Sequence, residues 1–131
     1  MSAHPRCLLA AAVISFTPRV PALAFDDSEF CQAAQQFAVA ENRDVGLWID
    51  RTTRNAGMTV TCETKVVEFK RFTYALSSSM SDAWKERKAA EWNARHCNNP
   101  VWSDAIRSGW KILFTTTSVD RKSASIIAEC K

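Results

Sequence analysis

Residues 97–130 read CNNPVWSDAIRSGWKILFTTTSVDRKSASIIAEC, with a cysteine at each end. Asn99 can cap a helix, and Pro100 suits the first helical position, where a missing N–H costs nothing. Gly109 allows the left-handed backbone that ends such a helix. The β-branched and aromatic residues that follow predict two paired strands, with a polar turn at 120–123. This stretch therefore predicts a short helix followed by a hairpin.

Two longer helices are expected earlier in the chain. Segment 27–41 begins with acidic residues and repeats apolar residues along one stripe, and segment 81–97 combines strong helix formers with a capping serine. Between them, residues 58–76 are β-rich and long enough for two strands, which we divide at 63–65. The apolar residues change face around Lys70–Arg71, which favours a bulge or a twist there.

The order of these elements predicts one α+β domain over residues 25–131. We expect a mainly antiparallel sheet of about four strands, covered on one face by two or three helices at 27–41, 81–97 and 100–108. No linker-like or low-complexity tract interrupts this region.

The first 24 residues have the pattern of a secretory signal peptide. Arg6 supplies a positive charge, and residues 7–16 form an apolar run that is too short to span a bilayer. Residues 22–24, Ala-Leu-Ala, fit the small-x-small pattern that a signal peptidase accepts. We expect cleavage after about Ala24, which places the mature chain in the periplasm or outside the cell. No later apolar run is long enough to predict a transmembrane segment.

The charge of the mature chain is close to neutral. The full chain has 17 basic and 14 acidic side chains, a formal net charge of +3. Arg6 and Arg19 leave with the signal peptide, so the net charge of the mature chain falls to about +1. This removes the argument for a nucleic-acid partner.

Four cysteines remain after cleavage: Cys31, Cys62, Cys97 and Cys130. An even number of cysteines in a small exported domain predicts a disulfide framework, and four allow three pairings. We favour Cys31–Cys62 and Cys97–Cys130, because each bond then ties a helix to the strand region that follows it. The wide spacing does not match the clustered ligands of a zinc site, so we expect neither a metal nor a cofactor.

A catalytic constellation is not evident in the mature sequence. His96 is its only imidazole, and it lies beside Cys97 near a helix C-terminus, where the dipole favours the charged form. The acidic residues are explained by helix starts and by a solvated helical face. Gly-x-Ser-x-Gly and phosphate-loop motifs do not occur. The sequence therefore gives an enzyme no support, without excluding one.

Tryptophan is frequent in the mature chain, with five residues at 48, 84, 92, 102 and 110. We expect Trp102 and Trp110 in the core beside the short helix. Trp48 and Trp92 fit the periodicity less well, and tryptophan beside basic side chains is a common anchor for a protein or a glycan. The candidate binding surface comprises Trp48, Trp92, Lys70, Arg71, Lys85, Arg87 and Lys88. A solvated face is the alternative interpretation of the basic residues.

The pattern Cys97-x-x-Pro100, then Gly109, a strand pair and Cys130, resembles small exported bacterial proteins that have no assigned activity. In those proteins a helical region precedes a cysteine, a short helix, a glycine, a hairpin and a final cysteine. The resemblance covers the last third of the chain and, more loosely, residues 52–76. It implies the fold and carries no catalytic residue with it.

These observations together favour a non-enzymatic periplasmic or secreted binding protein. We expect its partner to be another exported or envelope protein, with an inhibitor- or immunity-like relation between the two. The alternative is a small cell-envelope glycan-binding module or hydrolase.

Overall fold

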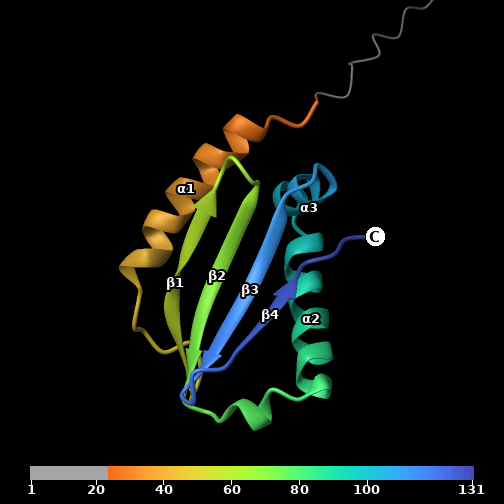
Figure 1. Ribbon diagram of the computed structural model, residues 1–131. Helices are drawn as coiled ribbons and strands as arrows, with labels where there is room; N and C mark the ends of the chain where they lie inside the picture. Colours follow the sequence, from red (N-terminus) through yellow and green to blue (C-terminus); the bar gives the residue numbers. More distant parts are fainter. Residues whose placement is uncertain (1–23) are drawn as a thin grey trace, which may run out of the picture.

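The computed structural model describes residues 24–131, so the signal peptide predicted at 1–24 lies almost wholly outside the described residues. Three helices, one short 3₁₀ helix and four strands follow one another (Figure 1). They are α1 (Asp27–Arg43), β1 (Thr53–Thr61), β2 (Val66–Thr73), η1 (Ser77–Ser79), α2 (Asp82–Cys97), α3 (Pro100–Arg107), β3 (Lys111–Ser118) and β4 (Ser123–Ile127). All three helices that the sequence predicts are confirmed. None of the helices in this part of the chain is long and apolar enough to cross a membrane.

Each α-helix begins at a side chain that caps its first turn. The Asp26 carboxylate accepts a hydrogen bond from the backbone N–H of Glu29 at 3.0 Å. Ser81 Oγ accepts one from Trp84 N at 3.2 Å, and Asn99 Oδ1 accepts one from Val101 N at 3.0 Å. These caps satisfy backbone donors that the helix itself leaves unpaired, so the local sequence fixes where each helix starts.

The four strands form one sheet in the order β1-β2-β3-β4. The hairpins β1–β2 and β3–β4 are antiparallel, whereas the central pair β2–β3 is parallel. The mainly antiparallel sheet is confirmed, with the correction that its strand directions are mixed. The parallel pair arises because α2 and α3 carry the chain back from the end of β2 to the start of β3.

The irregularity expected near Lys70–Arg71 lies on the neighbouring strand. Asn55 pairs with Arg71 and Gly57 pairs with Lys70, so Ala56 is the extra residue of a bulge in β1. Strand β2 keeps its alternation, and the polar Arg71 takes a position on the same face as the buried Phe69. The change of apolar face in the sequence therefore does not reflect a break in β2. It arises because the cationic Arg71 occupies a position on the face that also carries Phe69.

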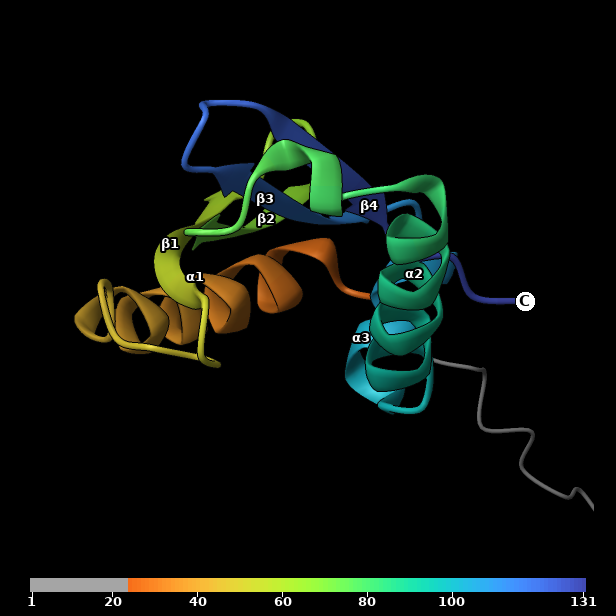
Figure 2. The same cartoon turned by 90° about the horizontal axis from the view of Figure 1, so that it is seen from below.

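All helices lie on one face of the sheet, which we call the covered face (Figure 2). Helix α1 packs against β1 and α2 packs against β4, so the two helices stand at opposite sides of this face. The core between sheet and helices contains Phe30, Met58, Val67 and Ile112, all of them buried. The strip of covered face between α1 and α2 is the place where a cavity can form.

Both predicted disulfide bonds are confirmed. Cys31 on α1 bonds to Cys62 just after β1, and Cys97 at the end of α2 bonds to Cys130 after β4. The Cα atoms lie 5.9 and 5.4 Å apart, respectively. Each bond ties a helix to the strand region that follows it, as expected for this pairing.

The core also contains an aromatic cluster near α3. Trp110 is buried and its ring centroid lies 4.7 Å from that of Phe30, while Trp102 packs against the same ring at 5.7 Å. Trp110 Nε1 donates a hydrogen bond to the Asp27 carboxylate at 2.9 Å. The expected core positions of Trp102 and Trp110 agree with these contacts, which join the start of α1 to the second half of the chain.

Candidate functional site

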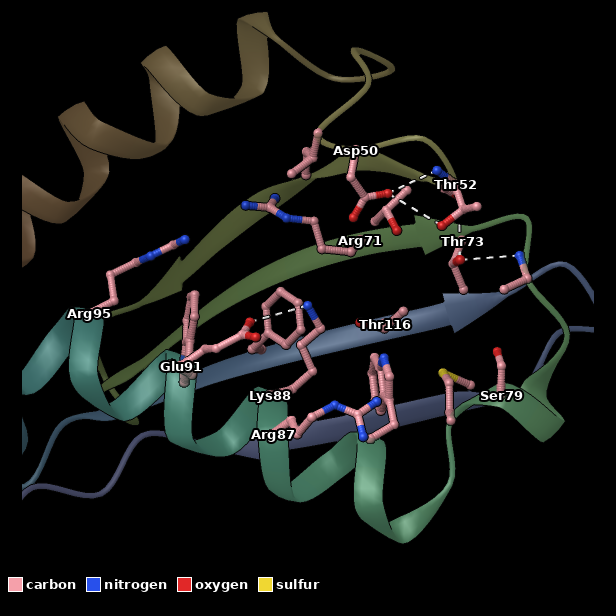
Figure 3. A pocket seen from close by; sticks show the side chains of 17 residues that line it. Asp50, Thr52, Arg71, Thr73, Ser79, Arg87, Lys88, Glu91, Arg95 and Thr116 are labelled. Carbon is pink, nitrogen blue, oxygen red and sulfur yellow. Dashed lines mark hydrogen bonds and ion pairs between the residues drawn. The ribbon is translucent and has the colours of Figure 1, made fainter.

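A cleft of about 430 Å³ opens on the covered face, between the loop that precedes β1 and helix α2 (Figure 3). We call it the basic cleft. Its lining comprises Ile49, Asp50, Thr52, Thr53, Arg71, Thr73, Ala75, Ser79, Met80, Trp84, Arg87, Lys88, Glu91, Trp92, Arg95, Phe114 and Thr116. A volume of this size lies within the range of ordinary ligand sites, about 300–1,000 Å³.

Strands β2 and β3 supply the floor of the basic cleft. Arg71 and Thr73 alternate with outward residues on β2, and Phe114 and Thr116 do the same on β3. The parallel register places Phe69 beside Phe114 and Arg71 beside Thr116, so the floor is apolar toward one end and polar toward the other. The mixed strand directions therefore bring together residues that are 45 positions apart in the chain.

Helix α2 supplies one wall of the basic cleft through residues spaced by three and four. Trp84, Lys88, Glu91 and Arg95 lie along one side of the helix, with Arg87 beside them. The opposite wall is the loop from Ile49 to Thr53. Because the outer wall residues Arg87, Glu91 and Arg95 are exposed, the cleft is open to solvent on that side.

Basic side chains outnumber acidic ones in the basic cleft, and both acids already have partners. Glu91 accepts from Lys88 Nζ at 3.2 Å. The Asp50 carboxylate accepts from the backbone N–H of Thr52 at 2.9 Å and from its hydroxyl at 3.3 Å. Although partial burial opposes it, hydrogen bonds from Thr52 and Thr53 lower the pKa of Asp50. Both acids of the cleft thus already accept hydrogen bonds from neighbouring groups.

Three arginines of the basic cleft lack an acidic partner. Arg71, Arg87 and Arg95 have no carboxylate within 4.0 Å among the residues that the structure describes. Arg71 Nη1 instead donates to Asn55 Oδ1 and to the carbonyl of Lys70, each at 3.1 Å. Burial lowers the pKa of Arg71, the charge of Glu41 raises it, and the charge of Arg95 lowers it again. An arginine remains charged in spite of such shifts, so like charges stand together at one end of the cleft.

Thr116 adds an unsatisfied group to the floor. Its side chain is 3% exposed, and its Oγ1 has no hydrogen-bond partner within residues 24–131. Figure 3 shows Thr116 on β3 in the middle of the cleft, among the side chains that α2 and β2 contribute. A buried hydroxyl without a partner carries a free-energy cost of about 1–3 kcal/mol.

Four of the seven residues of the predicted binding surface meet in the basic cleft: Trp92, Arg71, Arg87 and Lys88. Trp92 is buried: its side chain is 5% exposed and packs against Phe69 and Phe114. Helix α2 buries the side that carries Trp92 and His96, whereas Ala90 and Ala94 are exposed. Trp92 therefore shapes the floor of the cleft.

The remaining three predicted residues lie elsewhere. Trp48 is 52% exposed near the start of β1, where its ring stacks 5.3 Å from Tyr74 and the Arg54 guanidinium lies 4.2 Å above it. Lys70 lies on the opposite face of the sheet, 3.8 Å from Glu68. Lys85 lies on α2 outside the lining of the cleft.

The sequence interpretation missed Arg95, Asp50 and Thr116. Arg95 could have been found from its spacing of seven from Lys88, because both then lie on one side of a helix. Thr116 could have been found from strict alternation with the apolar Ile112. Asp50 carries no such signal, since its place in the cleft depends on how the loop folds back over β1.

His96 lies beneath the basic cleft, in a smaller cavity of about 160 Å³. The ring is 3% exposed, and its Nδ1 lies 3.0 Å from the Trp92 carbonyl. Burial lowers the pKa of His96, the Trp92 carbonyl raises it, and Arg95 lowers it. Burial of the ring thus opposes the charged form that a helix C-terminus favours.

A metal site is not apparent in the described part of the chain, where no three His, Cys, Asp or Glu side chains converge. No protein-family model matches the chain, and no curated protein matches it. A solved structure does share the fold: that of a Pseudomonas aeruginosa protein thought to be secreted. The two superpose with a TM-score of 0.62 at 12% identity, over 79% of this chain and 91% of that chain. At this identity the likeness concerns the fold alone.

Proposed function

We propose that the chain is a non-enzymatic binding protein of the periplasm or the extracellular space, and that the basic cleft holds a segment of another exported or envelope protein. An inhibitor- or immunity-like relation between the two proteins fits this role. The observation that carries the proposal is the cleft itself, in which most of the expected binding residues converge around unpaired arginines.

The chemistry of the lining supports binding over catalysis. Both acids of the basic cleft are hydrogen bonded, and Ser79 Oγ donates to the Leu76 carbonyl at 2.6 Å. The buried His96 faces the smaller cavity. The Thr52 hydroxyl lies 3.3 Å from Asp50 Oδ1, but no histidine among the described residues lines the cleft to complete a catalytic triad.

Two features support a location in the periplasm or outside the cell. The disulfides Cys31–Cys62 and Cys97–Cys130 are typical of oxidising environments outside the cytoplasm. A signal peptide cleaved after about Ala24 would deliver the chain there. The mature protein then begins just before α1, whose start is fixed by Asp26 and by the contact between Asp27 and Trp110.

An exposed apolar area next to the basic cleft supports a protein as partner. Ile49 belongs to the rim of the cleft and is also 51% exposed. Beyond it lie further exposed residues on the same loop and at the end of β2: Val45, Leu47, Trp48, Tyr74 and Leu76. Several exposed apolar side chains beside a cleft are a common mark of protein interfaces.

The alternative function, a small cell-envelope glycan-binding module or hydrolase, has one favourable observation. Trp48 and Tyr74 present neighbouring exposed rings, and exposed aromatic rings are suited to stacking on sugars. Binding to purified peptidoglycan that is lost in Trp48→Ala would favour this alternative. Trp92→Ala is unsuitable for the comparison because it removes a core side chain.

Affinity capture from periplasmic extract tests the main proposal. We expect the tagged mature protein to retain one partner at near-equal stoichiometry, and the double variant Arg87→Glu/Lys88→Glu to lose it. Arg107→Glu/Lys111→Glu is the matched control, because it makes the same charge change at exposed sites outside the cleft. Equal capture by both double variants, or no captured protein at all, would contradict the proposal.

A further inference from the structure

We infer that the basic cleft recognises a carboxylate on an acidic segment of the partner polypeptide, held at the end of the cleft where Arg71 and Arg95 lie. This inference rests on the proposed function and names the chemistry that the cleft selects. The carboxylate belongs to an acidic side chain or to the C-terminus of the partner polypeptide. Small organic acids and inorganic phosphate carry related charges, and the experiment below separates them.

The placement of the two guanidinium groups is the first argument. Arg71 comes from β2 and Arg95 from the last turns of α2, and both line the basic cleft and the smaller cavity behind it. Figure 3 shows their guanidinium groups at the same end of the cleft. Two neighbouring cations without a carboxylate partner raise each other's electrostatic energy, and one bound carboxylate would lower it for both.

The fixed position of Arg71 is the second argument. Its Nη1 is held by Asn55 and by the Lys70 carbonyl, so the planar group is oriented before any ligand arrives. An arginine that is already oriented loses less conformational entropy when it binds a carboxylate. Glu41 also lines the smaller cavity, where its charge raises the pKa of Arg71, but the two side chains form no ion pair within 4.0 Å.

The rest of the lining favours a polypeptide over a free anion. The lining also includes the apolar side chains of Phe114, Trp84, Met80 and the exposed Ile49. These side chains offer nothing to phosphate but can bury aliphatic side chains of a polypeptide segment.

The net charge of the lining fits an acidic segment. Four basic side chains, Arg71, Arg87, Lys88 and Arg95, face two acids, so the lining has a net charge of +2. One ion pair, Lys88–Glu91, is internal. The charge that remains matches a segment with one or two carboxylates.

The experiment titrates the mature protein with a fluorescent hexapeptide of alternating leucine and glutamate, blocked at both ends. Its partner probe replaces each glutamate by glutamine, and succinate and inorganic phosphate are tested as competitors. We expect the acidic peptide to bind at least tenfold tighter than the glutamine peptide, with an affinity that falls as salt rises. Arg95→Gln should remove this preference, whereas Arg107→Gln, a matched loss of an exposed arginine, should keep it.

Three outcomes would overturn the inference. Equal binding of the two peptides would show that the carboxylate is not recognised. An unchanged preference in Arg95→Gln would show that the carboxylate binds outside this end of the cleft. Full competition by equimolar succinate or phosphate would assign the site to a free anion. Affinity capture distinguishes these failures from failure of the proposed function. In one such result, the variant Arg95→Gln still captures the partner at wild-type level, with no displacement by the acidic peptide. That result would refute the carboxylate ligand but leave the proposed binding function standing.

Discussion

At the scale of single residues, His96 is part of the core. Its ring centroid lies 3.9 Å from that of Trp92 and 5.8 Å from that of Phe69. We expect His96→Ala to lower the free energy of unfolding by about 2–3 kcal/mol, because it opens a cavity between aromatic rings. Urea denaturation at pH 8 would measure the loss, and a loss below about 0.5 kcal/mol would contradict it.

The same histidine should make stability depend on pH. Burial lowers its pKa in the folded protein below the ordinary value of about 6.5, so the unfolded chain binds more protons between these two pKa values. Stability is therefore greatest above about pH 6.5, falls as the pH decreases through this window, and levels off below the folded pKa. His96→Gln should flatten the profile between pH 7 and 5 in thermal melts.

Gly57 and Gly109 provide a matched pair for testing backbone strain. Both have a positive φ, +107° and +97°, which disfavours any side chain. At Gly57 a Cβ would lie 2.9 Å from Asn42 Oδ1, which accepts the Met58 N–H at 2.8 Å, whereas at Gly109 it would meet nothing within 4 Å. We expect Gly109→Ala to cost about 1 kcal/mol and Gly57→Ala about 2–3 kcal/mol, because only the second also disturbs a hydrogen bond. Equal costs in chemical denaturation would exclude the role of Asn42.

At the scale of elements, the bond between Cys97 and Cys130 should contribute more to stability than any surface ion pair. It closes a loop with a sequence separation of 33, for which chain entropy gives about 3–4 kcal/mol. Lys88 and Glu91, three residues apart on α2, contribute less than about 0.5 kcal/mol. We expect Cys130→Ser to lower the melting temperature by more than 10 °C and Glu91→Gln by less than 2 °C. Similar shifts for the two variants would argue against this ranking.

The helices and turns were largely predictable because residues in the local sequence mark where they begin and end. Ser81, Asn99 and Pro100 mark helix starts that the structure reproduces, and the glycines mark turns. The parallel pairing of β2 with β3 was not predictable, since no local signal says which strand edge the returning chain will meet. The same limit applies to the basic cleft, because Arg71 and Thr116 become neighbours only through this pairing.

At the scale of the whole molecule, the Asp120 carboxylate connects two segments that are far apart in the sequence. Its carboxylate accepts hydrogen bonds from the backbone N–H of Ser77 at 3.0 Å and from the hydroxyls of Ser77 and Ser118. Asp120 thus joins η1, which leads into α2, to the turn between β3 and β4. This contact links both halves of the sequence at the end of the sheet opposite α3.

We expect the contacts of Asp120 to weaken only at a pH below the range in which His96 acts. The hydrogen bonds from Ser118 and Ser77 lower the pKa of Asp120 to about 2, below the ordinary value of about 3.9 for an unfolded chain. A carboxyl with a lowered folded pKa stabilises fully above its unfolded pKa and loses that effect as the pH falls through the folded value. We therefore expect a second decrease of stability between about pH 4 and 2, below the step caused by His96. Asp120→Asn should reduce this second step in acid titrations followed by circular dichroism and leave the His96 step unchanged.

The two disulfide bonds of the fold each join cysteines that are consecutive among those of the described chain, Cys31 to Cys62 and Cys97 to Cys130. A chain that enters an oxidising compartment N-terminus first presents them in this order. An oxidase that couples each cysteine to the next one to emerge would therefore make both native bonds directly. Biogenesis of this protein should then require thiol oxidation but no isomerase, because no wrongly paired intermediate has to be reshuffled.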